Sequence, residues 1–213
     1  RDLIPIESIK AVSMKPGFGY IWITNFRDST TDDLLKAIDD LEKDGEPLKG
    51  LILDLRDNPG GLLNQSVEVT DLFLNKGEIV SIKGRQERHT KVFKAHPNDV
   101  DRSFPMVVLI NGGSASASEI VAGALQDNKR AIIMGTTSFG KGSVQTVETL
   151  RGGYGLKFTI ARYYTPSGRS IQAKGIEPDI VVKQRIIDEK DVREEQRFLK
   201  EKDLKNHLEA EPE

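Results

Sequence analysis

The sequence predicts an α/β fold, because segments typical of strands alternate with segments typical of helices. Short apolar runs at 51–55, 106–110 and 131–134 are typical of buried strands. The first two of these runs lead through glycine-containing turns into segments whose apolar residues have helical spacing. A β-rich stretch at 144–164, broken by a glycine pair, adds further strands.

The first half of the chain begins with an expected strand at 19–25, followed by a helix from the hydroxyl-rich segment 29–31 to about Lys43. The strand at 51–55 ends in a sharp Asn-Pro-Gly-Gly turn, and a second helix follows it. We expect four residues of that helix to form its inner face: Val67, Val69, Leu72 and Phe73.

The second half contains segments of differing polarity. The runs 78–83 and 88–95 are expected to form a pair of exposed strands, because they are too polar for the centre of a sheet. A helix is expected at 116–126, with Ile120, Val121, Ala124 and Leu125 facing inward. Residues 185–213 are dense in charge, which indicates a solvated helix or tail.

Composition excludes several classes of function. The 213 residues carry a net charge of -2, so no overall positive field favours nucleic acid. No apolar run is long enough to span a bilayer, and we expect no stable membrane insertion. The absence of cysteine excludes disulfides, thiolate metal sites and a cysteine nucleophile. Because the chain opens at Arg1, we expect a fragment of a longer precursor.

The stretch 111–145 is the most informative part of the sequence. It places Ser116 at the start of a helix and the glycine-flanked Lys141 one strand later. A serine nucleophile needs a base, which is usually histidine. The three histidines lie in polar or charged segments without a serine motif: His89, His96 and His207. If Ser116 attacks a substrate, Lys141 is the best candidate base, and it must then be held neutral.

Ser116 also has a purely structural interpretation. With Glu119 it completes the S-x-x-E capping box, so it can simply cap the helix. The two roles share a location, since a helix N-terminus offers free N–H groups that stabilise an oxyanion. Ser114 and Ser118 are competing hydroxyls, and the local sequence does not choose among the three.

The segment around Lys141, GTTSFGKG, nearly matches the phosphate-binding G-x-x-x-x-G-K-[ST] pattern. Gly142 stands where the magnesium-binding hydroxyl belongs, and the following β-branched residues are a poor start for the required helix. We therefore reject nucleotide binding. A plain surface lysine is the alternative, but Phe139 can desolvate the amine and Gln145 can hold it in place.

The turn Asn58–Gly61 follows a buried strand, as does the turn before Ser116. Its structural interpretation is a turn in which glycine supplies a positive φ. Its functional interpretation is a backbone N–H directed at a bound carbonyl. Sites in open α/β sheets lie beyond the carboxyl ends of strands, which favours a shared site.

Taken together, these motifs resemble those of the carboxyl-terminal processing proteases, also called tail-specific proteases, from about Tyr20 to Val182. Four segments carry the resemblance: LILDLRDNPGG (51–61), NGGSASASEIVAGALQD (111–127), GTTSFGKGSVQ (135–145) and YYTPSGRSIQAKGIEPDI (163–180). The resemblance implies a serine protease with a Ser–Lys dyad, on a fold related to crotonases and the Clp protease, with no metal or cofactor.

The resemblance also implies a role for each matching residue. Ser116 is the nucleophile, Lys141 the base, and Gln145 the support of that lysine. Ala117 and either Gly60 or Gly61 match the oxyanion hole of the family. Asp127 matches a further acidic position. Asp127 can equally be structural.

The family usually carries a peptide-binding PDZ domain before the core, which this sequence lacks. We expect residues 1–15 to be a residual cap or linker, 16–184 the protease core and 185–213 the charged tail. The implied substrates are proteins or peptides with exposed C-terminal tails, and the implied location is the periplasm or cell envelope. A homo-oligomer is compatible with the sequence.

Two rival functions remain in other classes. One is a catalytically weak core of the same fold that acts as a binding or scaffold module. The other is a crotonase-type acyl-CoA enzyme, for which the sequence shows no adenine or pantetheine site. An activity-based serine probe and a test of coenzyme A binding separate these from a protease.

Overall fold

The computed structural model describes residues 7–43, 47–86, 90–100, 102–183, 200–204 and 207–209. In chain order the elements are β1 (Ile9–Lys15), β2 (Phe18–Ile23), α1 (Thr30–Leu41), β3 (Gly50–Asp54), α2 (Leu63–Asp71), β4 (Glu78–Gly84), β5 (Lys91–Lys94), β6 (Met106–Ile110), α3 (Ala117–Asp127), β7 (Ile132–Gly135), β8 (Ser143–Thr149), β9 (Gly155–Tyr164), β10 (Ile180–Val181) and the short 3-10 helix η2 (Glu201–Asp203). This alternation confirms the predicted mixed α/β class.

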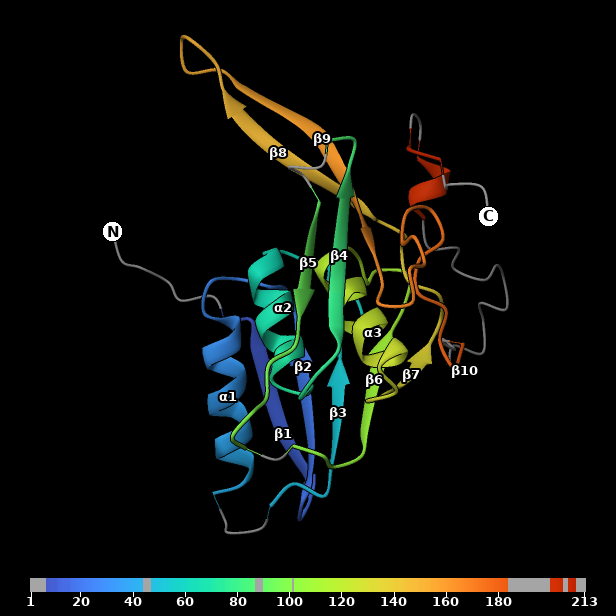
Figure 1. Ribbon diagram of the computed structural model, residues 1–213. Coiled ribbons are helices and arrows are strands. Elements are labelled where there is room, and N and C mark those ends of the chain that lie inside the picture. The colour runs from blue at the N-terminus through green and yellow to red at the C-terminus, as the bar shows by residue number, and fades with distance from the viewer. Residues whose placement is uncertain are drawn as a thin grey trace, which may run out of the picture.

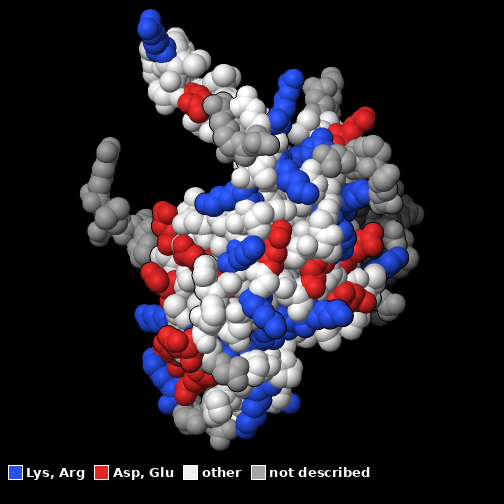
Figure 2. All heavy atoms as spheres, viewed as in Figure 1, with Lys and Arg blue, Asp and Glu red and all other residues white. Residues whose placement is uncertain are grey.

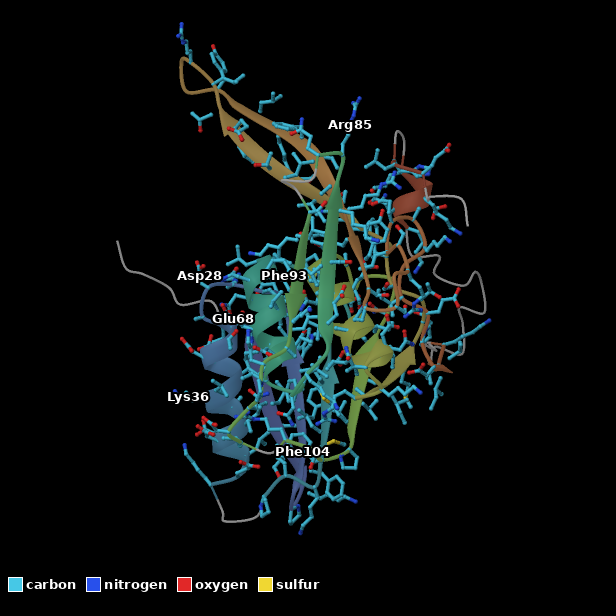
Figure 3. The ribbon with its side chains drawn as sticks, viewed as in Figure 1. Asp28, Lys36, Glu68, Arg85, Phe93 and Phe104 are labelled. Carbon is cyan, nitrogen blue, oxygen red and sulfur yellow. The ribbon has the colours of Figure 1, made fainter. Side chains whose placement is uncertain are left out.

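The main sheet has six strands in the order β1-β2-β3-β6-β7-β10. Its strands run parallel except for β1, which pairs with β2 in the antiparallel direction. Helices α1, α2 and α3 lie on one face of this sheet (Figure 1). The core lies between the two layers, where neighbouring strands contribute fully buried residues: Ile21, Leu53, Val108 and Ile133. Lys36 points from α1 away from the sheet (Figure 3).

A second sheet, with the order β5-β4-β9-β8, is antiparallel. Strand β4 contacts α2 and α3 and crosses in front of them in Figure 1. The expectation that 78–83 is too polar to be central is wrong, because β4 pairs with a strand on each side and buries Ile79, Val80 and Ile82. Its charged residues Glu78 and Lys83 lie near its ends. Strand β5 is an exposed edge, as expected, while Arg88 and His89 lie outside the described residues.

Strands β8 and β9 form a hairpin whose far part projects from the body as an arm (Figure 1). Its turn contains Gly152 and Gly153, both with positive φ. Apolar side chains on the arm are exposed, with Val147 63% and Tyr154 73% accessible. The viewed face of the arm is mostly uncharged, whereas the body mixes both signs of charge (Figure 2).

Several boundaries differ from those expected. Residues 9–15, expected within a linker, form β1 and pair with β2. Helix α2 buries Val69, as expected, and Phe73 beyond its end is also buried. Its buried face also includes polar side chains: Gln65, Ser66 and Thr70. Of the expected charged tail, 185–213, only residues 200–204 and 207–209 are among the described residues. No helix in the described segments is long and apolar enough to cross a membrane.

Candidate active site

Ser116 occupies a sharp turn between β6 and α3. It is the N-cap of α3, with φ of 55° and ψ of -110°. A residue with a side chain rarely adopts this conformation, and such strain is typical of functional sites. A strained turn between a strand and a helix is also the feature by which α/β-hydrolases expose a nucleophilic serine. Ser116 is partly exposed, so a substrate can reach it.

The two neighbouring serines are already committed to structural hydrogen bonds. Both are fully buried. The Ser114 hydroxyl donates to the carbonyl oxygen of Leu55 at 2.7 Å, and the Ser118 hydroxyl donates to that of Asn58 at 2.9 Å. These bonds tie the turn before α3 to the turn after β3. Of the three serines, only Ser116 is accessible.

Lys141 lies in the loop between β7 and β8, and this loop is fixed by its backbone. The N–H of Phe139 donates to the carbonyl of Ser114 at 2.9 Å, which brings the loop against the turn that carries Ser116. The Gly140 carbonyl accepts the N–H of Ala173 at 2.8 Å on the other side. The Lys141 side chain is half-buried, and its ammonium group has no hydrogen-bond or ion-pair partner among the described residues.

Glu119 connects the two candidate catalytic segments. One oxygen of its carboxylate, Oε2, accepts the backbone N–H of Ser116 at 2.8 Å and that of Lys141 at 2.9 Å. The sequence identified Glu119 only as half of a capping box. Its bond to Ser116 is present, but the contacts to the Lys141 loop bridge more than twenty residues and carry no local sequence signal.

The glycine turn packs directly against the start of α3. A Cβ on Gly60 would lie 3.0 Å from the Cβ of Ser116 and 3.0 Å from the backbone nitrogen of Ala117. The N–H of Gly60 already donates to the Asn58 side chain at 2.9 Å. Gly61 forms a bridge with Phe26 in which the carbonyl of Gly60 and the N–H of Leu62 take part. The N–H of Gly61 points the other way and has no partner among the described residues.

The structure does not bring the other two matched side chains to Lys141 or Ser116. Gln145 is exposed on β8, and in the described part of the chain its amide makes no hydrogen bond to Lys141. Asp127 is the last residue of α3, roughly 16 Å along the helix from Ser116 at 1.5 Å per residue. It accepts the N–H of Ser167 at 2.9 Å and forms an ion pair with Arg169 at 2.5 Å.

The charge state of Asp127 fits this clamp. Burial acts to raise the pKa of its carboxyl, but hydrogen bonds from Thr165 and Ser167 and the charge of Arg169 outweigh burial and lower that pKa. Asp127 therefore stays ionised at neutral pH and holds the loop that follows β9.

Neither described histidine forms a hydrogen bond with Ser116. His96 pairs with Asp71 at 2.8 Å beside α2, and the ring of His207 contacts the carbonyl of Leu204. His89 lies outside the described residues. In the described part of the chain, no group of three or more His, Asp or Glu side chains is arranged to hold a metal ion.

Comparison with known proteins gives consistent matches. Residues 17–182 match peptidase family S41. The chain is 54% identical over 186 residues to a carboxy-terminal-processing protease of Bartonella bacilliformis, covering 86% of this chain and 43% of that protein. It is 41% identical over 180 residues to the carboxy-terminal processing protease CtpA of Bacillus subtilis, covering 84% of this chain and 38% of that protein.

Among solved structures, the photosystem II D1 C-terminal processing protease has a similar fold, with a TM-score of 0.74 and 36% identity. That match covers 84% of this chain and 49% of the other. The chain thus spans less than half the length of each of these relatives. The sequence motifs, the placement of Ser116 and these matches agree: the chain belongs to peptidase family S41, the family of serine-type C-terminal processing proteases.

Proposed function

We propose that this chain is the catalytic core of a serine endopeptidase in which Ser116 is the nucleophile and Lys141 the general base. The observation that supports this most is the contrast among the three serines. Ser114 and Ser118 are buried and hydrogen-bonded, whereas Ser116 is accessible on a strained helix N-cap. Its backbone shares a carboxylate oxygen with that of Lys141, so the two segments are neighbours.

In the proposed reaction, neutral Lys141 removes the proton from the Ser116 hydroxyl as its oxygen attacks the scissile carbonyl carbon. The resulting oxyanion accepts hydrogen bonds from the backbone N–H groups of Ala117 and Gly61. We choose Gly61 over Gly60 because the N–H of Gly60 is already used by Asn58. The protonated lysine then donates its proton to the leaving amine, and water hydrolyses the acyl-enzyme.

We propose that the substrates are proteins with exposed C-terminal tails, and that the whole protein acts after export. The names of the relatives support the first point for those proteins, and the lack of cysteine is compatible with the second. The relation to crotonases and the Clp protease, the supporting role of Gln145, and a homo-oligomer stay predictions.

The decisive experiment compares Ser116→Ala with Ser114→Ala and Ser118→Ala in cleavage of casein and in labelling by a fluorophosphonate probe. Ser116→Ala should abolish both signals while the protein stays folded, at a cost of about 0.5–2 kcal/mol for the altered cap. Labelling should survive in any Ser114→Ala or Ser118→Ala protein that folds. Labelled Ser116→Ala protein would show that another hydroxyl is the nucleophile.

A further inference from the structure

Glu119 is a fully buried carboxyl group at the centre of the candidate site. Each oxygen of its carboxylate accepts two hydrogen bonds. Oε2 accepts from the backbone of Ser116 and Lys141, at 2.8 Å and 2.9 Å. Oε1 accepts from the backbone of Gly140 at 2.7 Å and from the Ser138 hydroxyl at 2.5 Å. Four donors on one buried carboxylate satisfy its full acceptor capacity.

A third residue also bonds to the Ser138 hydroxyl. The backbone N–H of Ile176 donates to the Ser138 oxygen at 2.6 Å. That bond occupies a lone pair of the hydroxyl oxygen and leaves its proton free to point at Glu119. The carboxylate is therefore surrounded by donors alone, which is the arrangement that an ionised group requires.

The two bonds at Oε2 are the ones that matter for chemistry. Because both backbone nitrogens donate to the same oxygen, the nitrogens of Ser116 and Lys141 are separated by no more than the sum of the two hydrogen-bond lengths. The turn that carries Ser116 precedes α3, and the loop that carries Lys141 precedes β8. In the described structure this oxygen joins the two segments directly. A misplacement of about 1 Å between reacting groups can cost roughly 100-fold in rate.

We propose that Glu119 is a positioning residue for the reaction, and that its ionised form holds Ser116 and Lys141 in register. This rests on the proposed function. Glu119 does not touch substrate; it acts through the two residues that do.

The environment of Glu119 makes its ionisation titrate near neutrality. Burial raises its pKa to about 7, although the bonds from Ser138, Ser116, Gly140 and Lys141 oppose that rise. The ammonium group of Lys200 bonds to the carbonyls of Thr137 and Ser138, and its charge favours the ionised carboxylate.

Other charged groups near the carboxylate belong to the segments packed against it. Lys141 lies on the loop between β7 and β8. Glu201, next to Lys200, donates its backbone N–H to the carbonyl of Phe139 at 3.1 Å. Asp203 accepts the N–H of Lys200. When Glu119 is protonated, the oxygen that carries the hydrogen gives up an acceptor site, so one of the four bonds breaks or, at Ser138, reverses its direction. Site geometry should therefore loosen as pH falls below about 7.

The first test needs neither activity nor a variant. In the ¹⁵N-labelled wild-type chain, the amide resonances of Ser116, Gly140 and Lys141 should titrate together with one midpoint near pH 7, because they share one carboxylate. The amide of Leu48, which donates to Glu42 at 3.0 Å, serves as the control and should not follow that midpoint. Independent midpoints, or no titration between pH 5.5 and 8.5, would overturn the proposal.

The second test uses Glu119→Gln, Glu119→Asp and the matched control Glu42→Gln. Glutamine has the same shape, but its NH₂ opposes two of the four donors, and it does not ionise. At pH 8, Glu119→Gln should lower the rate of fluorophosphonate labelling and kcat/KM by about 100-fold. Its profile should also lack the acidic limb near pH 7 that wild type and Glu42→Gln share.

Aspartate keeps the charge with a shorter arm, so Glu119→Asp should recover part of the rate and retain an acidic limb. A Glu119→Gln enzyme with wild-type rate and profile would refute the positioning role. If Glu119→Gln does not fold, the amide titration of wild type decides. If Ser116→Ala stays active while the three amides co-titrate, the proposed nucleophile is wrong and the carboxylate geometry still holds.

Discussion

At the residue scale, Lys141 is the group whose proposed role depends on losing a charge. Lys141→Arg keeps the positive charge, but arginine is not deprotonated in proteins. We expect Lys141→Arg to be as inactive as Lys141→Ala, with at least about a 100-fold loss in kcat/KM. Peptidase assays on both variants measure this loss. As a control, the His96→Ala variant, which changes a histidine beside α2, should stay active. A working Lys141→Arg enzyme would rule out the Ser–Lys mechanism.

Glu119 should also leave a signature in stability. Its pKa in the folded protein, about 7, lies above its ordinary value of 4.5, so the folded state binds more protons between these two values. The free energy of unfolding should therefore fall as pH rises from about 4.5 to about 7, and level off above. Each pKa unit of separation is worth about 1.4 kcal/mol.

Urea unfolding of wild type and Glu119→Gln across this pH range measures the effect. The difference between the two curves should carry the slope, because glutamine does not titrate. Parallel curves would mean that the pKa of Glu119 does not differ between the folded and unfolded states.

Which of these residues was predictable depends on how far away their partners lie. The motifs around Ser116 and Lys141 were sufficient to nominate both residues. Local sequence did not choose among the three serines, because their burial depends on carbonyls of Leu55 and Asn58, which are about sixty residues away in the chain. Glu119 was visible only as a capping residue for the same reason.

At the element scale, the glycine turn after β3 is the part least able to accept a side chain. Gly61 has φ of 147°, and a Cβ there would lie 2.0 Å from the carbonyl oxygen of Phe26. Gly61→Ala must shift the turn, so we expect a destabilisation of more than about 1 kcal/mol and a loss of probe labelling. Denaturant unfolding and labelling measure the two effects.

Gly153→Ala is the matched control for that variant. Gly153 also has positive φ, 81°, but a Cβ there would meet nothing within 4 Å. It should cost only the left-handed backbone penalty of about 1–2 kcal/mol, with full labelling. Equal labelling in both alanine variants would count against an oxyanion role for Gly61.

Periodicity predicted most elements, because the core strands and α3 bury continuous or regularly spaced apolar residues. It did not predict the position of β4, whose end residues are charged while its middle is buried by both neighbouring strands and the helices. It also left β1 as a linker, since that strand is a mostly exposed edge that gains order only by pairing with β2.

At the scale of the whole molecule, the protein divides into a packed body and the β8–β9 arm. Thr146 and Phe158 are paired across the arm, so residues 147–157 can be replaced by Asn-Gly, which favours a tight hairpin turn. The removed apolar side chains are exposed: Val147, Leu150, Tyr154 and Leu156. The free energy of unfolding should change by less than about 1 kcal/mol, and probe labelling of Ser116 should persist.

Urea unfolding and fluorophosphonate labelling of the shortened protein check this expectation, with the wild-type chain as the full-length reference. A second comparison sets the rate at which the shortened protein cleaves protein substrates against the rate at which the small probe labels it. If labelling is lost in a folded protein, the arm takes part in forming the site, and the division into body and arm is wrong.

The backbone of Ser116 has an evolutionary consequence. Its φ of 55° and ψ of -110° suit glycine far better than serine, and a strained residue of this kind costs of the order of 1–3 kcal/mol. Glycine is also an acceptable N-cap. Mutational drift in a copy of this gene released from selection for catalysis should therefore favour glycine at position 116. Such a descendant would be more stable than its ancestor and catalytically inactive. Glycine at this position would therefore mark a lineage that has lost catalysis.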